Sequence, residues 1–162
     1  VSAAALSVPS GWQVAHTLVV DQMIAPNPSS LFPPISLLTT LAPADVEDML
    51  ALIAVTEPGP FRPATIRMGH YLGVRRAGRL VAMAGQRLNL DTATEISAVC
   101  TDPAHRHQGY AGALVAHLAA EVHRAGKLPF LHVVPDNDAS RIYERAGFVR
   151  RARVQLTVIT RL

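Results

Sequence analysis

The sequence predicts a single mixed α/β domain, in which helices flank a central and mostly antiparallel sheet. Two observations support this prediction. The chain has 162 residues, of which 49% are apolar and 17% are charged, so one domain with a hydrophobic core of its own is expected. Runs typical of strands and runs typical of helices follow one another along the chain, and such an order builds layered α/β structures.

The N-terminal elements are expected to be a strand, a loop and a helix. A strand is predicted over about 13–24, and four prolines between positions 26 and 34 then favour an irregular loop. A proline and three acidic residues open the next segment, which predicts a helix over 43–55 with negative charge at the positive end of its dipole. Three prolines and a glycine in 56–63 end this helix in a second loop.

Three strands are expected next, with antiparallel pairing. Apolar and β-branched residues fill 70–76 and 79–88, and the sequence Arg76-Ala77-Gly78-Arg79 between them fits a hairpin turn. The third strand covers 94–101.

The C-terminal elements alternate between helix and strand. Apolar residues recur at three- and four-residue steps over 108–125, which predicts an amphipathic helix that ends at Gly126. The apolar run 130–134 fits a buried central strand. A second helix over 139–146 and a last strand over 148–159 follow.

The strongest functional pattern is VCTDPAHRHQGYAG at 99–112, which runs from a strand through a loop into a helix. The first N–H groups of a helix lack partners and carry partial positive charge, so a helix start can hold a phosphate that the backbone can approach. Gly109 allows that approach, and the small Ala111 and Gly112 leave room for it. The alternative is a glycine-containing helix start that binds no ligand.

This segment resembles the signature of the GNAT superfamily of acyl-CoA-dependent N-acyltransferases: Gln or Arg, two residues, Gly, one residue, then Gly or Ala. Arg106, Gly109 and Ala111 match it. The resemblance covers 71–159 and implies a GNAT-like fold in which two neighbouring strands splay apart. It implies acetyl-CoA as cosubstrate, with its pyrophosphate on the amides of 107–112.

The resemblance also implies the other contacts with the cofactor. Backbone groups of the third central strand, left free by the splay, would pair with the amides of acetyl-CoA. The expected set of cofactor-binding residues is Val99, Cys100, Thr101, Arg106, His107, Gln108, Gly109, Tyr110, Ala111, Gly112, Val134, Asn137, Ser140 and Tyr143.

Residues 137–148, NDASRIYERAGF, resemble the family's C-terminal pattern of Asn, Ala, Tyr and Gly-Phe. By this resemblance Tyr143 would lie near the CoA sulfur and protonate the departing thiolate; the alternative is a core tyrosine. A phenol, with a pKa of about 10, is protonated at neutral pH and can serve as a donor. The family places Asn seven residues before Tyr, whereas Asn137 stands six before it, so either Asn137 or Asp136 would meet the pantetheine arm.

Glu95 stands eleven residues before Arg106, a spacing that resembles the general-base glutamate of some family members. A partly buried carboxylate with a raised pKa is suited to accept the proton of an amine, directly or through water. The alternative is a solvated glutamate at a strand edge.

Other classes of site have less support. No converging set of zinc ligands is present, so no metal is predicted, and His105 and His107 are expected beside the phosphate. Cys100 is expected to be a small buried residue rather than a nucleophile. The basic run 150–153 is expected to be a solvated strand end, because aromatic residues are only 5% of the chain and nucleic-acid binding usually needs them.

The expected function is transfer of an acetyl group from acetyl-CoA to a primary amine in a ternary complex, and the alternative is a noncatalytic acyl-CoA-binding module. Residues 1–68 form the variable acceptor-side half, with 31–68 lining the acceptor site, and 70–160 form the acyl-CoA-binding core. No apolar run is long enough to span a membrane. The single cysteine fits a reducing, cytoplasmic compartment. The sequence is compatible with a homodimer.

Overall fold

The structure, a computed structural model, describes residues 7–29, 31–32 and 36–162. It contains strands, α-helices and short 3-10 helices. The strands are β1 (Trp12–Ile24), β2 (Leu38–Thr40), β3 (Tyr71–Arg76), β4 (Arg79–Asn89), β5 (Ala93–Thr101), β6 (Leu128–Val133) and β7 (Val149–Arg161). The helices are η1 (Pro43–Asp45), α1 (Val46–Thr56), η2 (Pro63–Met68), η3 (Pro103–His105), α2 (Tyr110–Arg124) and α3 (Ala139–Arg145).

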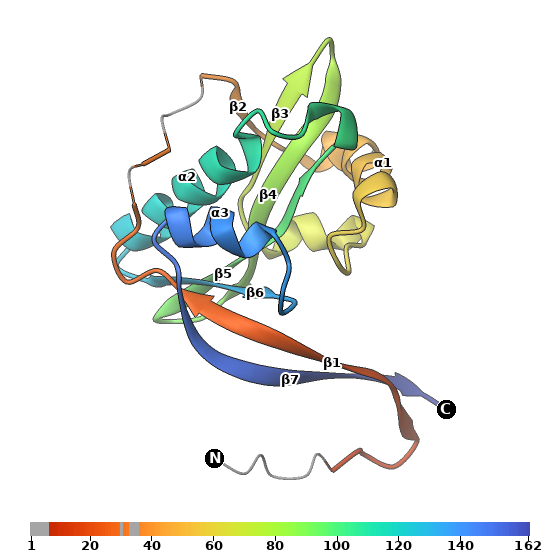
Figure 1. Ribbon diagram of the computed structural model, residues 1–162. Coiled ribbons are helices and arrows are strands. Elements are labelled where there is room, and N and C mark those ends of the chain that lie inside the picture. The colour runs from red at the N-terminus through yellow and green to blue at the C-terminus, as the bar shows by residue number, and fades with distance from the viewer. Residues whose placement is uncertain (1–6, 30, 33–35) are drawn as a thin grey trace.

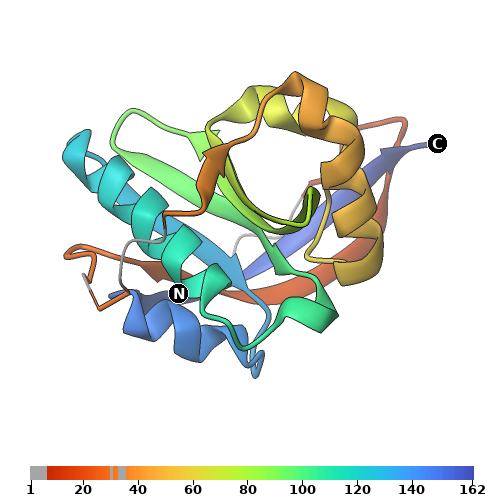
Figure 2. The same ribbon diagram turned by 90° about the horizontal axis from the view of Figure 1, so that it is seen from above.

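The strands form one seven-stranded sheet in the order β2-β3-β4-β5-β6-β1-β7. Only β5 and β6 pair in parallel, and every other recorded pair is antiparallel. Helices α2 and α3 lie side by side over one face, and α1 with η2 covers the other (Figures 1 and 2). The predicted mixed α/β domain with a mostly antiparallel sheet and flanking helices is confirmed.

Two hydrophobic cores hold the layers together, one on each side of the sheet. On the α2 side, Leu114 and Leu118 pack against sheet residues such as Leu131. On the α1 side, Met49 and Leu52 pack against a group that includes Tyr71. All six side chains are at most 3% exposed, so each helix is fixed to the sheet by full burial of its apolar stripe.

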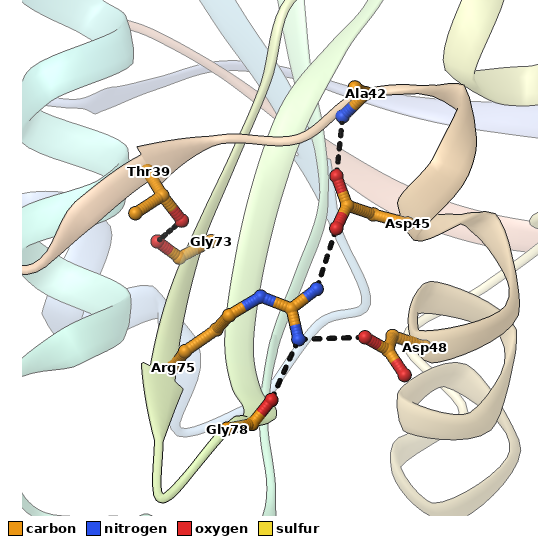
Figure 3. Close-up of polar contacts among 7 residues, drawn as sticks. All are labelled: Thr39, Ala42, Asp45, Asp48, Gly73, Arg75 and Gly78. Atoms are coloured by element: carbon orange, nitrogen blue, oxygen red, sulfur yellow. Dashed lines mark hydrogen bonds and ion pairs between the residues drawn. The ribbon is translucent and has the colours of Figure 1, made fainter.

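Arg75 fixes the start of α1 on the β3–β4 hairpin. Its guanidinium donates to Asp45 Oδ1 at 2.6 Å and to the Gly78 carbonyl at 2.9 Å, and it contacts Asp48 Oδ2 at 2.7 Å (Figure 3). Asp45 also accepts the Ala42 N–H at 2.7 Å. The acidic residues predicted to favour the helix dipole therefore also bind a cation from the sheet.

The element boundaries differ from prediction where the backbone turns left-handed. The α2 helix begins at Tyr110 rather than 108, because φ is +62° at His107 and +79° at Gly109, values that an α-helix does not allow. The predicted hairpin turn is present, with φ of +46° at Ala77 and +82° at Gly78. Neither β2 nor η2 was expected.

The N-terminal strand lies inside the sheet, next to the last strand of the chain. Only its last residues, Asp21–Ile24, pair with β6, whereas Trp12–Ile24 pair along nearly all of β7. The strand therefore lies between β6 and β7, and its first half forms a two-stranded ribbon with β7 that leaves the body of the molecule (Figure 1). Within the described part of the chain, no helix is long and apolar enough to cross a membrane.

Candidate active site

The loop before α2 presents an open helix start. Gly109 is the N-cap and has no side chain to bond the first N–H groups, so the amides of the first turn, at 110–112, are not capped by a side chain. Arg106, His107 and Gln108, just before it, are exposed. The structure thus brings together the predicted loop residues at a helix start whose amides no side chain caps, an arrangement suited to an anion. The expectation that Gly112 leaves room there is wrong, because the Phe32 ring fills the space, only 2.1 Å from where a Cβ would stand.

Contacts with β4 and the β3–β4 hairpin fix this loop. The Asp102 N–H donates to the Val81 carbonyl at 2.8 Å, and Asp102 Oδ1 accepts the Ala104 N–H at 2.8 Å. The Tyr110 hydroxyl donates to Gln108 Oε1 at 2.7 Å and accepts from Arg76 Nε at 2.7 Å. Sequence reasoning missed Arg76, a second positive charge at this helix start, because it lies 34 residues from Tyr110 along the chain.

The two neighbouring strands part beside this loop. The recorded β5–β6 register covers three pairs and ends at Glu95–Phe130. Farther along, Ala98 has φ of +53°, and the β4–β5 register shifts between Gly85–Ser97 and Met83–Cys100, which marks a β-bulge. The edge of β5 at 99–101, as the resemblance implied, has no recorded pairing with β6 among the described residues.

Tyr143 lies on α3 and is 8% exposed. Burial, with the nearby Cys100 as a lesser cause, raises the pKa of Tyr143 to about 12. Its ring packs edge-on against Phe148, with 6.3 Å between the ring centroids. Among the described residues no hydrogen bond of its hydroxyl is recorded, so the phenol is held in place by packing and keeps its proton at neutral pH.

Cys100 is a buried strand residue, as expected, and is 6% exposed. Burial raises the pKa of its thiol to about 11, against a smaller lowering by a hydrogen bond with Thr56. A thiol that holds its proton so firmly is a poor nucleophile at neutral pH.

Two of the residues expected from the β6–α3 connection line one groove. Asn137 and Ser140 line it together with Asp136, Asp21 and other residues of β1, β7 and α3. Asn137 Oδ1 accepts the N–H of Ala139 at 2.9 Å and so caps α3. The other predicted residue of this connection, Val134, is 52% exposed.

Glu95 is buried, at 1% exposed, and both of its oxygens are occupied. Arg87 donates to Oε2 from Nε at 2.8 Å and to Oε1 from Nη2 at 2.7 Å, and His132 Nδ1 lies 2.9 Å from Oε1. Burial alone would raise the pKa of Glu95, but the hydrogen bonds from His132 and Arg87 outweigh it and lower the pKa. The expectation of a raised pKa, and that of a solvated strand edge, are therefore not met.

Arg87 and His132 were not among the predicted residues. Arg87 and Glu95 each stand one position beyond the paired Gln86 and Ile96 of the β4–β5 hairpin, and opposite charges so placed in two predicted neighbouring strands were a signal that could have been used. His132 gave a weaker signal, a polar residue in an otherwise apolar strand. Among the described residues, no three His, Cys, Asp or Glu side chains converge as metal ligands.

The basic run at the start of β7 is exposed, as expected for a solvated strand end. The side chains of Arg150 and Arg153 are 63% and 53% exposed. Arg153 nevertheless pairs with Asp21 on β1, with Nε donating to Oδ1 at 2.8 Å. Two residues of this run thus help to join β7 to β1, because Arg151 donates to Gln22 Oε1 at 2.7 Å.

Comparison with known proteins identifies the class. The sequence model of the family described as "FR47-like protein" matches residues 71–157. The chain is similar to the crystal structure of an acetyltransferase assigned to the GNAT family from Novosphingobium aromaticivorans DSM 12444. The two share 36% identity with a TM-score of 0.85, over 97% of this chain and 70% of the other. The chain belongs to the GNAT superfamily of acetyltransferases.

More distant structures share the fold. A GCN5-related N-acetyltransferase from Kribbella flavida is 25% identical, with a TM-score of 0.61 over 91% of this chain. The ribosomal-protein-S18-alanine N-acetyltransferase of Escherichia coli is 22% identical, with a TM-score of 0.61 over 71% of this chain and 78% of the other. The chain spans 60% of the K. flavida protein and 57% of a GNAT acetyltransferase from Colwellia psychrerythraea. No curated protein matches the sequence.

Proposed function

We propose that the chain transfers an acetyl group from acetyl-CoA to a primary amine by direct attack in a ternary complex. The observation that carries this proposal is the packing of Tyr143 in one core cluster with Tyr110, the first residue of α2, and with Val99 of β5 against it. The start of α2 has no side-chain cap, the edge of β5 beyond Glu95 has no recorded β6 partner among the described residues, and the phenol of Tyr143 is protonated.

The cofactor is proposed to lie where β5 and β6 part, beyond the Glu95–Phe130 pair. Amides of 107–112 would hold the pyrophosphate, because helix-start N–H groups and the helix dipole both favour negative charge. Arg106 adds positive charge, and Arg76 supports the loop through Tyr110. The backbone of 99–101 would pair with the amides of the pantetheine arm, with Val134, Asn137 and Ser140 on the other side of it.

The chemistry needs a neutral amine, a positioned thioester and a donor for the leaving group. The amine nitrogen forms a bond with the acetyl carbon, the carbon–sulfur bond breaks, and the Tyr143 hydroxyl gives its proton to the thiolate. Holding the two reactants together supplies much of the rate gain, as in other proximity-driven reactions. No metal is needed for these steps.

The proton of the amine is proposed to leave toward Glu95. The carboxylate cannot meet the amine directly, because it is 1% exposed and both oxygens are bonded to Arg87 or His132. Glu95 would therefore act through a neighbouring group or a water molecule rather than as the group that contacts the amine.

The acceptor is proposed to bind on the α1 side of the sheet, against part of 31–68. Phe61 packs edge-on against Tyr71 there, with 5.8 Å between the ring centroids, so the segment after α1 lies over the same face as Glu95. The acceptor's identity depends on this variable segment and on the rest of the longer proteins that the chain resembles. A cytoplasmic location and a homodimer stay predictions from the sequence.

An acetylation screen tests the proposal. The purified chain is incubated with acetyl-CoA and a library of small-molecule and peptide amines, and release of free CoA thiol is followed, while calorimetry measures acetyl-CoA affinity. The proposal expects binding of acetyl-CoA and transfer to at least one amine class. Binding without transfer to any amine would favour the noncatalytic module, and absence of binding would contradict both.

A further inference from the structure

His132 stands at the point where β5 and β6 part. Phe130 is the last β6 residue paired with β5, and His132 comes two positions after it. The His132 side chain is 14% exposed, whereas that of Glu95 is 1% exposed. Phe130 packs edge-on against the imidazole, with 5.7 Å between the ring centroids, and limits its orientation. The Arg87 side chain is more exposed, at 26%, but a guanidinium has only donors. Of these three residues, the imidazole is therefore the one that is both partly exposed and able to take a proton.

The network defines which nitrogen of His132 carries the proton. Arg151 has only donors to offer, so the side-chain atom of Gln22 at 2.7 Å from Arg151 Nη1 must be the oxygen. The amide nitrogen of Gln22 then faces His132 Nε2 at 3.3 Å, and Nε2 must accept. Nδ1 consequently carries the hydrogen and donates to Glu95 Oε1 at 2.9 Å.

We infer that His132 is the group that takes the proton from the acceptor amine, and that Glu95 and Arg87 are positioning residues acting through it. This inference rests on the proposed acetyl transfer. As the nitrogen–carbon bond forms and the carbon–sulfur bond breaks, the ammonium proton passes to the lone pair of Nε2, and Tyr143 protonates the sulfur. Release of the proton from Nε2 to solvent, with reprotonation of Tyr143, restores the starting state.

The surroundings of His132 suit this role. Glu95 from β5 holds the Nδ1 hydrogen and faces the imidazolium that forms, and the bidentate Arg87 from β4 keeps that carboxylate ionised. Arg151 from β7 does not contact His132 itself but bonds to Gln22 of β1, which does. From β3, the neutral phenol of Tyr71 faces Arg87 and Glu95. The 3.3 Å contact with Gln22 is long for a hydrogen bond, so an amine or a water can replace it.

His132→Asn is the first test, because its amide can still donate to Glu95 but cannot take a proton. We expect kcat/KM to fall by about 100-fold, and the acid limb that remains in its pH profile should follow protonation of the free amine alone. Acetyl-CoA affinity, measured by calorimetry, and the melting temperature should stay near those of the unaltered protein. His117→Asn, at an exposed position on α2, is the matched control and should change none of these.

Gln22→Glu is the second test and leaves His132 in place. A carboxylate beside Nε2 favours the imidazolium, so the acid limb of kcat/KM should move upward by about one pH unit for the same amine. If the acid limb instead reflects protonation of the free amine substrate, it should not move in this variant. If the unaltered protein transfers acetyl groups but neither variant changes the pH profile of kcat/KM, the role of His132 is overturned and the proposed function stands. If the unaltered protein transfers none, the proposed function itself is overturned.

Discussion

The Tyr143 phenol keeps its proton throughout the physiological range, because burial raises its pKa to about 12. A proton donor must be protonated when the thiolate leaves. Because a thiol has a pKa of about 8.5, its thiolate is already a fairly stable leaving group. The phenol is therefore protonated when the thiolate leaves, although its raised pKa makes it a weaker acid than the thiol. Its loss should affect the chemical step more than binding.

Replacing Tyr143 by Phe tests this donor. We expect kcat to fall by about 100-fold, since general acid catalysis is typically worth that much, while calorimetry finds acetyl-CoA affinity nearly unchanged. Trp12→Phe, which also changes an aromatic side chain but lies at the exposed end of β1, is the control. It should leave kcat unchanged, and equal losses in the two variants would contradict the donor role.

The buried Glu95 carboxylate should make stability depend on pH. Its pKa is lowered below the ordinary 4.5, so its contribution to stability is fully present above that value and is lost as the pH falls through the lower, folded-state pKa. Glu95→Gln leaves Arg87 without its partner and should cost about 3 kcal/mol of unfolding free energy at pH 7. In urea titrations this cost should shrink toward pH 3, whereas a cost independent of pH would contradict the pairing. Glu47→Gln, at an exposed position, is the control.

Single residues were predictable where a short motif defines them. Arg106 and Gly109 stand in a local pattern and lie just before α2, and Tyr143 lies on α3, as their patterns predicted, while their contacts with the cofactor stay predictions. Arg76 and His132 were missed because their partners lie 34 and 37 residues away, and only the sheet brings them together.

At the scale of elements, β3 and β4 approach so closely at one point that only glycine fits. A Cβ on Gly85 would lie 2.1 Å from Tyr71 Cδ1, so the Tyr71 ring covers the strand where a side chain would otherwise stand. This contact holds Tyr71 in the α1-side core, next to the Glu95 network.

Gly85→Ala should therefore destabilise the protein by about 3 kcal/mol, at the upper end of the usual cost of overpacking. Denaturant unfolding measures the change. In the double variant Gly85→Ala with Tyr71→Leu, the loss of unfolding free energy should be smaller than the sum of the losses in the two single variants. The smaller side chain at position 71 makes room for the new methyl group. Strictly additive losses would contradict the contact.

Most elements were predictable because their patterns are local. The proline and acidic residues at its start identified α1, the period of apolar residues identified α2, and the Ala77-Gly78 turn identified the β3–β4 hairpin. β2 has only three residues, of which Thr39 and Thr40 are exposed, so it offers no apolar alternation to detect.

At the scale of the whole molecule, β1 near the start of the described chain pairs with β7 at its end. It fills the sheet between β6 and β7, and β7 has no other recorded strand neighbour. The order of strands was not predictable, because the choice of partner depends on contacts between residues more than a hundred positions apart, such as Gln22 with His132 and Arg151.

A chain that begins at Ala25 should therefore lose cooperative folding, since β7 would have no strand to pair with. Circular dichroism should show a shallow thermal transition, and a synthetic peptide of residues 11–25 should restore a sharp one. A peptide of the same composition in scrambled order is the control. Cooperative unfolding of the shortened chain alone would contradict the structural role of β1.

The account depends on one anion site, and a crystal structure with bound coenzyme A tests it most directly. The account predicts the pyrophosphate within hydrogen-bond distance of the amides of 107–112, with the thiol end in the splay near Tyr143. Clear density for coenzyme A elsewhere on the protein, or an empty helix start in crystals grown at a saturating concentration of the cofactor, would contradict it.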